Sequence, residues 1–374
     1  MTIEQLKKTA AGLDLGIAML KECNLRCAYC HPYGQSKIAY AENAKDNMTE
    51  SETKQAISVA YEAGFKNFKL TGGEPTLLPW FGRIVEYIAA MDPDNKINIV
   101  TNGTNLSKVM DLLEAYKDAI ALQVSLDSFN TANISNGLDK VLTVTLKSQL
   151  DELSNRKIKT RLNMVVTKIN KDEVPAMIDI ASELGFSIKL FNLFIQEDYI
   201  ATNGSFNGSS TQLSDPKDFW KANYVDLGEL IPYLAKAADT ELKSTKDGIY
   251  GSAKEFRIKG IDVLLLDSMR GHFYNIEECV KKCSRFCKPS DRGMYNPMIS
   301  SNMVLHIDDC YNPMLRWNLR GASHNSQLLS FETVLKIFSN LHFIAGKVNP
   351  NTLNFVPDEF EPPVLDTSID AYGE

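Results

Sequence analysis

The sequence predicts an α/β protein built around a sheet of parallel strands. Strand-like apolar segments alternate with segments of helical period about every 30 residues in the first part of the chain. Six such units follow one another, and consecutive β/α units place their strands in parallel through right-handed crossovers. With 374 residues, 44% of them hydrophobic, the chain can bury a substantial core.

The six expected strands cover residues 13–20, 67–70, 97–101, 119–125, 160–166 and 188–194. Helices are expected between them. The helix over residues 49–63 opens with Thr49-Glu50-Ser51-Glu52, which is typical of a capping box. The helix over residues 171–184 carries its apolar residues at helical spacing, so we expect one of its faces to be buried.

The composition changes after the sixth unit. Residues 201–216 are rich in Asn, Gly and Ser, which predicts a linker or mobile loop. A helix over 225–238, strands over 255–258 and 261–266, and a helix over 331–341 are expected beyond it. The predicted organisation is a β/α domain over 1–200, the linker, a C-terminal domain over 217–348 and an irregular, acidic tail over 349–374.

The charge and the apolar runs of the chain exclude several classes of protein. A formal net charge of −7 without a long basic tract argues against binding to nucleic acid or to a membrane surface. Residues 1–12 are polar and resemble no secretory signal, and no apolar run elsewhere is long enough to span a membrane. We therefore expect a cytoplasmic protein without a membrane partner.

The first cysteine group is Cys23, Cys27 and Cys30, in a Cys-x3-Cys-x2-Cys spacing directly after the first expected strand. Three thiolates this close can hold three corners of a four-iron cluster and leave one iron open. Structural zinc prefers Cys-x2-Cys pairs and a fourth ligand, for which the neighbouring His31 is poorly spaced. Disulfides are disfavoured in a reducing cytoplasm, and three chance buried thiols are the remaining alternative.

The second cysteine group comprises Cys279, Cys283, Cys287 and Cys310. Four thiolates can hold a second four-iron cluster, but tetrahedral zinc takes the same number of ligands. All seven cysteines fall into these two groups with none between them, which indicates two separate thiolate sites.

Polar groups gather where the expected strands end, which is where parallel β/α folds place their chemistry. The strand ends read Thr71-Gly72-Gly73-Glu74-Pro75, Thr101-Asn102-Gly103-Thr104 and Ser125-Leu126-Asp127-Ser128. Glycines there let the backbone approach a ligand, and hydroxyls and carboxylates can bind one. The alternatives are a plain strand-to-helix turn at Gly72-Gly73 and helix caps at Asp127 and Ser128.

The cysteine loop and these strand ends together resemble the radical S-adenosylmethionine (SAM) superfamily. The resemblance implies a partial (β/α)6 TIM-type barrel and a [4Fe–4S] cluster that is held by Cys23, Cys27 and Cys30 and binds SAM through its open iron. It implies SAM contacts at the Gly72, Gly73, Glu74, Pro75, Thr101, Ser125 and Asn163 positions, and it places Tyr29 beside the adenine, where packing is the alternative. It also favours a C-terminal extension with an auxiliary [4Fe–4S] cluster over zinc.

Within this superfamily the chain looks like the GTP 3′,8-cyclases of molybdenum cofactor biosynthesis. The resemblance extends from Cys23 to the late cysteines and to Leu319-Arg320-Gly321-Ala322-Ser323. The departures fall where the cyclases bind GTP. Thr76-Leu77-Leu78-Pro79 has no cation, four cysteines replace three at the auxiliary site, and the chain ends in Asp370-Ala371-Tyr372-Gly373-Glu374 instead of a glycine pair.

The expected function is therefore a radical SAM enzyme that forms a 5′-deoxyadenosyl radical and abstracts hydrogen from a small-molecule substrate in a biosynthetic tailoring pathway. A nucleotide, sugar or amino-acid derivative is the expected substrate, and flavodoxin or ferredoxin the expected reductant. The alternatives are a GTP 3′,8-cyclase, a peptide-modifying maturase and a non-catalytic iron–sulfur redox or assembly protein. Such maturases often carry a leader-peptide domain before the barrel, whereas here residues 1–22 precede Cys23.

Overall fold

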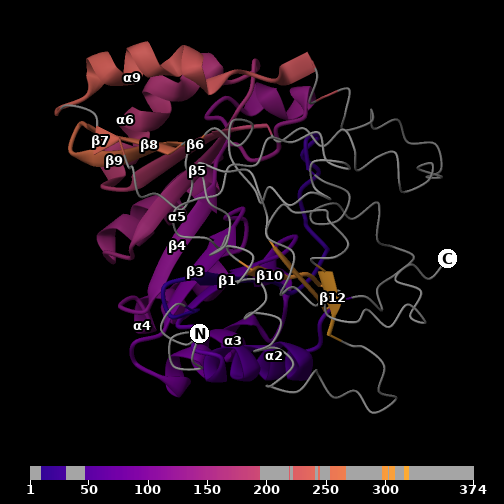
Figure 1. Ribbon diagram of the computed structural model, residues 1–374. Helices are drawn as coiled ribbons and strands as arrows, with labels where there is room; N and C mark the ends of the chain where they lie inside the picture. Colours follow the sequence, from indigo (N-terminus) through magenta and orange to yellow (C-terminus); the bar gives the residue numbers. More distant parts are fainter. Residues whose placement is uncertain are drawn as a thin grey trace, which may run out of the picture.

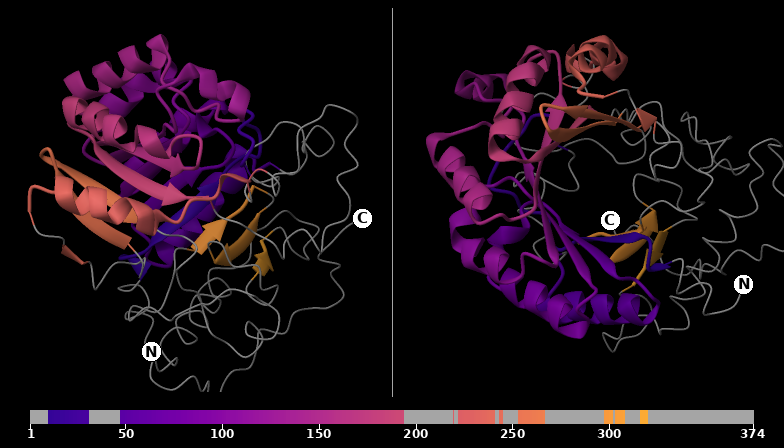
Figure 2. Two further views of the ribbon diagram at one scale, coloured as in Figure 1. Left: turned by 90° about the horizontal axis from the view of Figure 1, so that it is seen from above. Right: turned by 90° about the vertical axis from the view of Figure 1, so that its left-hand side faces the viewer.

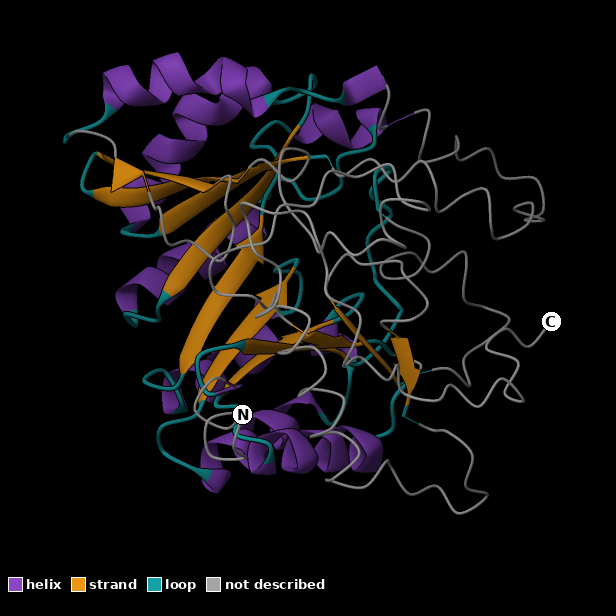
Figure 3. Cartoon of the chain, in the orientation of Figure 1, coloured by secondary structure: helices purple, strands orange, loops and turns teal. Residues whose placement is uncertain are grey.

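The computed structural model describes residues 10–30, 47–193, 219, 222–240, 243–244, 253–266, 297–301, 303–307 and 316–319. In this part of the chain, helices cover one face of a twelve-stranded sheet (Figures 1 and 3). The sheet curves into an open arc with helices on its outer side, as the right-hand view of Figure 2 shows. This is the predicted α/β fold, a barrel that is partial and does not close.

Six parallel strands form the centre of the sheet, in chain order. They are β1 (Asp14–Ala18), β2 (Asn67–Thr71), β3 (Lys96–Thr101), β4 (Ile120–Ser125), β5 (Thr160–Val166) and β6 (Ser187–Asn192). The helices between them are α2 (Glu50–Glu62), α3 (Phe81–Met91), α4 (Leu106–Ala115), α5 (Val144–Asn155) and α6 (Val174–Leu184). The six predicted strands are confirmed to within three residues at every end.

Local sequence explains where two of the helices begin. The Thr49 hydroxyl accepts a hydrogen bond from the Glu52 backbone N–H, and the Glu52 carboxylate accepts one from the Thr49 N–H, so the predicted capping box is confirmed. The helix predicted over 171–184 starts instead with a 3₁₀ turn, Lys171–Glu173, before α6. Pro175 lies in the first turn of α6, where its missing N–H leaves no α-helical bond unmade.

The core lies between the sheet and its helices. Leu70, Ile99 and Leu122 occupy one face of neighbouring strands and are at most 1% exposed. Because side chains alternate along a strand, the residues on either side of these three point to the opposite face of the sheet. In the described part of the chain no helix covers that face, which lines the inside of the arc. The polar residues of the strands collect on this inner face.

Later segments extend both edges of the sheet. Strand β9 (Ile261–Leu266) pairs with β6 in parallel and is followed outward by the antiparallel β8 (Ala253–Ile258) and β7 (Lys243–Ser244). On the other edge, β10 (Pro297–Ile299) pairs with β1 in parallel, and the antiparallel β11 (Val304–Ile307) and β12 (Arg316–Asn318) lie beyond it. The described strands after residue 217, β7 to β12, are thus hydrogen-bonded into the same sheet as the six central strands.

Other predictions for the later chain have mixed outcomes. The strands predicted over 255–258 and 261–266 are confirmed, and the helix predicted over 225–238 is a 3₁₀ turn, Leu227–Leu230, followed by α9 (Ile231–Ala237). The predicted linker over 201–216, the helix over 331–341 and the tail lie outside the described residues. Among the described residues, no helix is both long and apolar enough to cross a membrane. The domain boundaries stay predictions.

The loop after β1 and the turn after β2 are held against each other by their backbones. The N–H of Gly73 donates to the Leu20 carbonyl oxygen at 2.8 Å, and the N–H of Glu74 donates to the Glu22 carbonyl oxygen at 2.8 Å. A Cβ atom on Gly73 would lie 1.9 Å from the Glu22 oxygen. Only glycine permits this approach, so Gly73 fixes the position of the loop that leads into the cysteines.

Replacing Gly73 with alanine is expected to lower stability. The added methyl group must push the two loops apart, and overpacking of this kind costs about 1–3 kcal/mol. We expect the midpoint of urea unfolding, followed by circular dichroism, to fall in Gly73→Ala.

The matched control for this change is Gly82→Ala in α3. The nearest atom to a Cβ there is 3.7 Å away, an ordinary contact, and alanine favours a helix over glycine. Its midpoint should equal or exceed that of the wild type. Equal midpoints for Gly73→Ala and the wild type would contradict the requirement for glycine at Gly73.

Candidate functional site

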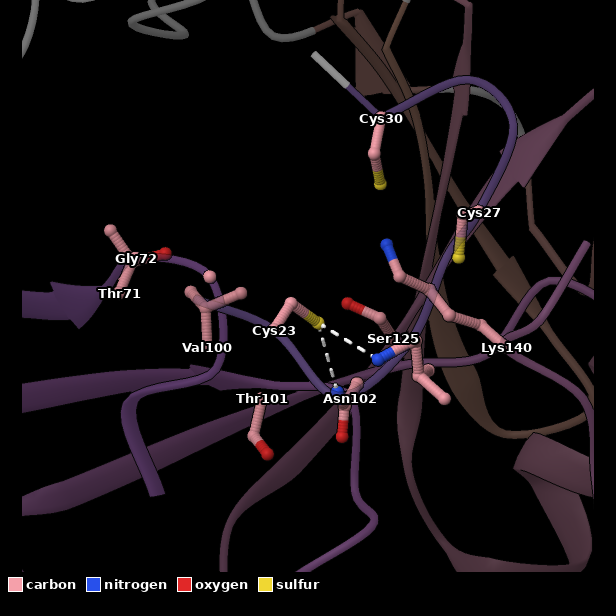
Figure 4. A pocket seen from close by; sticks show the side chains of 12 residues that line it. Cys23, Cys27, Cys30, Thr71, Gly72, Val100, Thr101, Asn102, Ser125 and Lys140 are labelled. Atoms are coloured by element: carbon pink, nitrogen blue, oxygen red, sulfur yellow. Dashed lines mark hydrogen bonds between the residues drawn. The ribbon is translucent and has the colours of Figure 1, made fainter. Parts of the chain in front are cut away.

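A pocket opens at the carboxyl ends of β1 to β4 (Figure 4). Four loops that are far apart in the sequence contribute to its wall, as expected where parallel strands end together. Of the residues predicted from the sequence, the pocket brings together Cys23, Cys27, Cys30, Gly72, Gly73, Thr101 and Ser125. Tyr29, Glu74, Pro75 and Asn163 lie outside this wall, although each is close to it in sequence or register.

The three cysteines are free thiols that are at most 9% exposed. The Cys23 sulfur accepts weak hydrogen bonds from the Leu25 backbone N–H at 3.4 Å and from the Asn102 side-chain amide at 3.5 Å. The Cys30 thiol donates a hydrogen bond to Cys27, which lowers the pKa of Cys27 and raises that of Cys30, and burial raises the pKa of Cys23. All three sulfur atoms project into the same space (Figure 4).

The segment Gly137 to Lys140 holds the cysteine loop from the other side. The N–H of Ala28 donates to the Gly137 carbonyl oxygen at 2.9 Å, and the N–H of Arg26 donates to the Asp139 carboxylate at 2.5 Å. Gly137 has a φ of +88°, and a Cβ atom there would lie 2.5 Å from the Ala28 Cβ. No local sequence pattern indicates this contact, because more than a hundred residues separate the two segments.

Tyr29 ties the cysteine loop to the end of β4. Its hydroxyl donates a short hydrogen bond to the Asp127 carboxylate, and its ring packs against Phe219 with centroids 6.3 Å apart. Burial and the Asp127 charge together raise the pKa of Tyr29 well above its usual range, so the phenol stays protonated and keeps donating. The structure therefore gives Tyr29 a packing and tethering role, and its predicted position beside an adenine stays a prediction.

The Glu74 side chain is fully buried and turns toward β3. Its carboxylate accepts hydrogen bonds from the Thr76 hydroxyl at 2.6 Å, the Thr101 hydroxyl at 2.7 Å and the Asn102 backbone N–H at 2.6 Å. Pro75 begins the short 3₁₀ turn Pro75–Leu77 directly after it. Glu74 thus joins the ends of β2 and β3, and the predicted contact of its carboxylate with SAM stays a prediction.

Ser125 and Asn163 pair across β4 and β5, so their side chains lie on the same inner face of the sheet. The Asn163 amide donates to the Gln123 side-chain oxygen at 3.1 Å. Its own Oδ1 is buried and finds no hydrogen-bond donor among the residues that the structure describes. A buried acceptor left in this state favours a bound molecule that carries a donor.

Five pocket residues were not among the predicted site residues: Leu25, Thr71, Val100, Asn102 and Lys140. Two of them, Asn102 and Lys140, bring side-chain nitrogens to the wall. Asn102 follows Thr101 directly, so the polar strand end already contained the signal for it. Lys140 lies 15 residues beyond Ser125 in a loop, where only the tertiary fold could bring it to the pocket. Burial lowers the pKa of Lys140, but the charges of Cys30, Cys27 and Asp127 outweigh this and hold it above its ordinary value.

The chemistry of this donor set suits an iron–sulfur cluster. Three buried thiols surround one pocket, and soft thiolate ligands select iron–sulfur clusters, copper(I) or zinc. The backbone of Gly72 and Gly73 adds polar atoms for a ligand beside the thiols, and the Asn163 oxygen lies on the next strand to Ser125, on the inner face of the sheet. The second cysteine group, Cys279, Cys283, Cys287 and Cys310, lies outside the described residues.

The chain is similar in sequence to curated GTP 3′,8-cyclases. The probable GTP 3′,8-cyclase of Pyrococcus horikoshii is 31% identical over 192 residues, which are 50% of this chain and 57% of that protein. The GTP 3′,8-cyclase of Chlorobaculum tepidum is 28% identical over 197 residues, which are 52% of this chain and 57% of that protein. The chain thus spans little more than half the length of these relatives.

Solved structures and a family profile agree with the predicted fold. The crystal structure of Streptococcus suis SuiB has a TM-score of 0.53 at 16% identity, covering 90% of this chain and 68% of that chain. The structure of anSMEcpe with bound AdoMet has a TM-score of 0.51 at 16% identity, covering 88% of this chain and 83% of that chain. The profile of the radical SAM superfamily matches residues 17–186. Residues 17–186 are therefore similar to the radical SAM superfamily.

Proposed function

We propose that this protein is a radical SAM enzyme that reductively cleaves SAM and abstracts a hydrogen atom from a small-molecule substrate. The observation that carries the proposal is the convergence of the Cys23, Cys27 and Cys30 thiols with the Gly72-Gly73 backbone in one pocket. The cluster, once reduced by one electron from the reductant, would supply the electron that cleaves the SAM sulfonium to methionine and a 5′-deoxyadenosyl radical, and that radical would take hydrogen from the substrate.

The residues of this chain would hold and shield that chemistry. The three thiolates would bind three irons, while the Gly72-Gly73 backbone, Ser125 and the unpaired Asn163 oxygen would orient SAM. Burial of the cysteines excludes water from the cluster side of the pocket, which protects a reactive intermediate from side reactions.

An anionic small molecule fits the inner face of the barrel best. Lys69, Arg161 and Lys189 are each half-buried and share the face of Thr71, Ser125 and Asn163 by strand alternation and register. Partly desolvated cations on one face favour a phosphate or carboxylate. This supports a nucleotide, sugar phosphate or amino-acid derivative as substrate.

The named relatives favour one specific alternative, a GTP 3′,8-cyclase. We propose tailoring of another substrate as the main function, because Thr76-Leu77-Leu78-Pro79 offers no cation next to the strand end. A second [4Fe–4S] cluster on the late cysteines, a flavodoxin or ferredoxin as reductant and a cytoplasmic location complete the proposal.

The Cys27→Ala variant tests the first cluster. Two thiolates cannot hold the cluster firmly, so iron per chain should fall by about four and anaerobic formation of 5′-deoxyadenosine from SAM and reductant should be lost. Iron analysis and chromatography of the product measure both. Ser148→Ala, an exposed change of one atom on α5, should keep wild-type values. Normal 5′-deoxyadenosine formation by Cys27→Ala would refute the assignment.

The choice of substrate is tested with GTP. Anaerobic 5′-deoxyadenosine formation by the wild type is compared with GTP, without substrate, and with anionic biosynthetic precursors. We expect a slow background that GTP does not stimulate and that a precursor increases severalfold. Stimulation by GTP together with a cyclised nucleotide product would instead make the protein a cyclase.

The second cluster is tested by Cys310→Ala. Loss of this cluster should reduce iron from about eight to about four per chain, while the three-cysteine site keeps its own iron. Iron and zinc are measured together by elemental analysis. Unchanged iron with one bound zinc per chain would reject an auxiliary iron–sulfur cluster.

A further inference from the structure

Lys140 places a positive charge among the three cysteine thiols. It lines the same pocket as Cys23, Cys27 and Cys30, and its ammonium group points toward the Cys27 and Cys30 sulfur atoms in Figure 4. The Lys140 nitrogen also lies 5.1 Å from the centre of the Tyr29 ring, within the range of a cation–π contact. A cation in this position would face the cluster itself.

The surrounding residues fix the backbone of Lys140 in place. The N–H of Asp127 donates to the Lys140 carbonyl oxygen at 2.7 Å, which joins this segment to the end of β4. The Gly137 carbonyl and the Asp139 carboxylate bind the cysteine loop on the other side. The backbone of Lys140 is therefore held between the two elements.

We propose that the Lys140 ammonium group raises the reduction potential of the cluster bound by the three cysteines. The inference rests on the proposed function, because it needs that cluster. Each reduction adds one electron to a group that already carries three thiolates. A neighbouring cation stabilises the reduced form more than the oxidised form, and the effect is large where water is excluded.

Two carboxylates lie near the pocket, and both are engaged by hydrogen-bond donors. Asp127 accepts from the Tyr29 hydroxyl and, at 2.9 Å, from the Val165 backbone N–H, and Glu74 accepts from the Thr76 and Thr101 hydroxyls and the Asn102 N–H. These donors spread the carboxylate charges away from the pocket. Lys140 is then the group whose charge faces the sulfur atoms.

The test is a potentiometric titration of the reconstituted full-length protein without SAM, followed by electron paramagnetic resonance. The signal to follow is the one that disappears in Cys27→Ala. In Lys140→Met, which keeps length but removes charge, the midpoint potential should shift to more negative values. Lys140→Arg keeps the charge and should retain a midpoint close to the wild type.

The control is Lys108→Met, which removes the same charge from an exposed position on α4, where water and salt screen it. Its midpoint should not change. An unchanged midpoint in Lys140→Met, or equal shifts in Lys140→Met and Lys140→Arg, would overturn the proposal. If Lys140→Met binds no cluster, the Lys140→Arg variant becomes the test. Loss of the cluster in Lys140→Arg as well would show that the charge at this position is not what matters, and it would overturn the proposal.

Failure of the proposed function would give other results than failure of the Lys140 inference alone. A wild type without a Cys27-dependent signal, or without 5′-deoxyadenosine formation, would reject the cluster assignment itself. A wild type with both, and with a Lys140→Met midpoint that equals its own, would reject only the role of Lys140.

Discussion

The site depends on the close backbone contact between the loop after β1 and the turn after β2. Two hydrogen bonds of 2.8 Å hold Gly73 and Glu74 against Leu20 and Glu22, and no side chain larger than hydrogen fits at Gly73. This contact sets where the first cysteine emerges relative to the next strand end. The Glu74 carboxylate also fixes the end of β3, because it accepts hydrogen bonds from the Thr101 hydroxyl and the Asn102 N–H. Three strand ends are thereby locked in one arrangement.

Buried polar groups hold the other side of the cysteine loop. Burying a carboxylate is costly unless it is hydrogen-bonded, and Asp127 meets this condition through Tyr29 and Val165. The same network joins the cysteine loop to β4 and β5. The loop is therefore positioned by protein contacts on both sides, which allows three thiols to face one pocket within a protein scaffold that is already ordered.

The partial barrel explains how one face can serve both cofactor and substrate. The outer face of the sheet is covered by helices and buries residues such as Ile99, whereas the inner face carries Lys69, Arg161 and Lys189. The pocket of the cysteines lies at one end of that inner face. A substrate bound by the basic residues would thus lie next to the cofactor and away from the helices.

The sequence by itself determined the six β/α units, the capping box at Thr49 and the cysteine spacing, because each is encoded by residues close together in the chain. It also identified Ser125 and the Gly72-Gly73 turn as candidate site residues, since the ends of strands can be predicted from local composition. Only the tertiary structure decided the direction of the Glu74 carboxylate, the tether from Tyr29 to Asp127 and the place of Lys140 in the pocket. Glu74 and Thr101 are 27 positions apart in the chain, and Tyr29 and Asp127 are 98 apart. No local pattern specifies which distant groups a buried carboxylate or ammonium will meet.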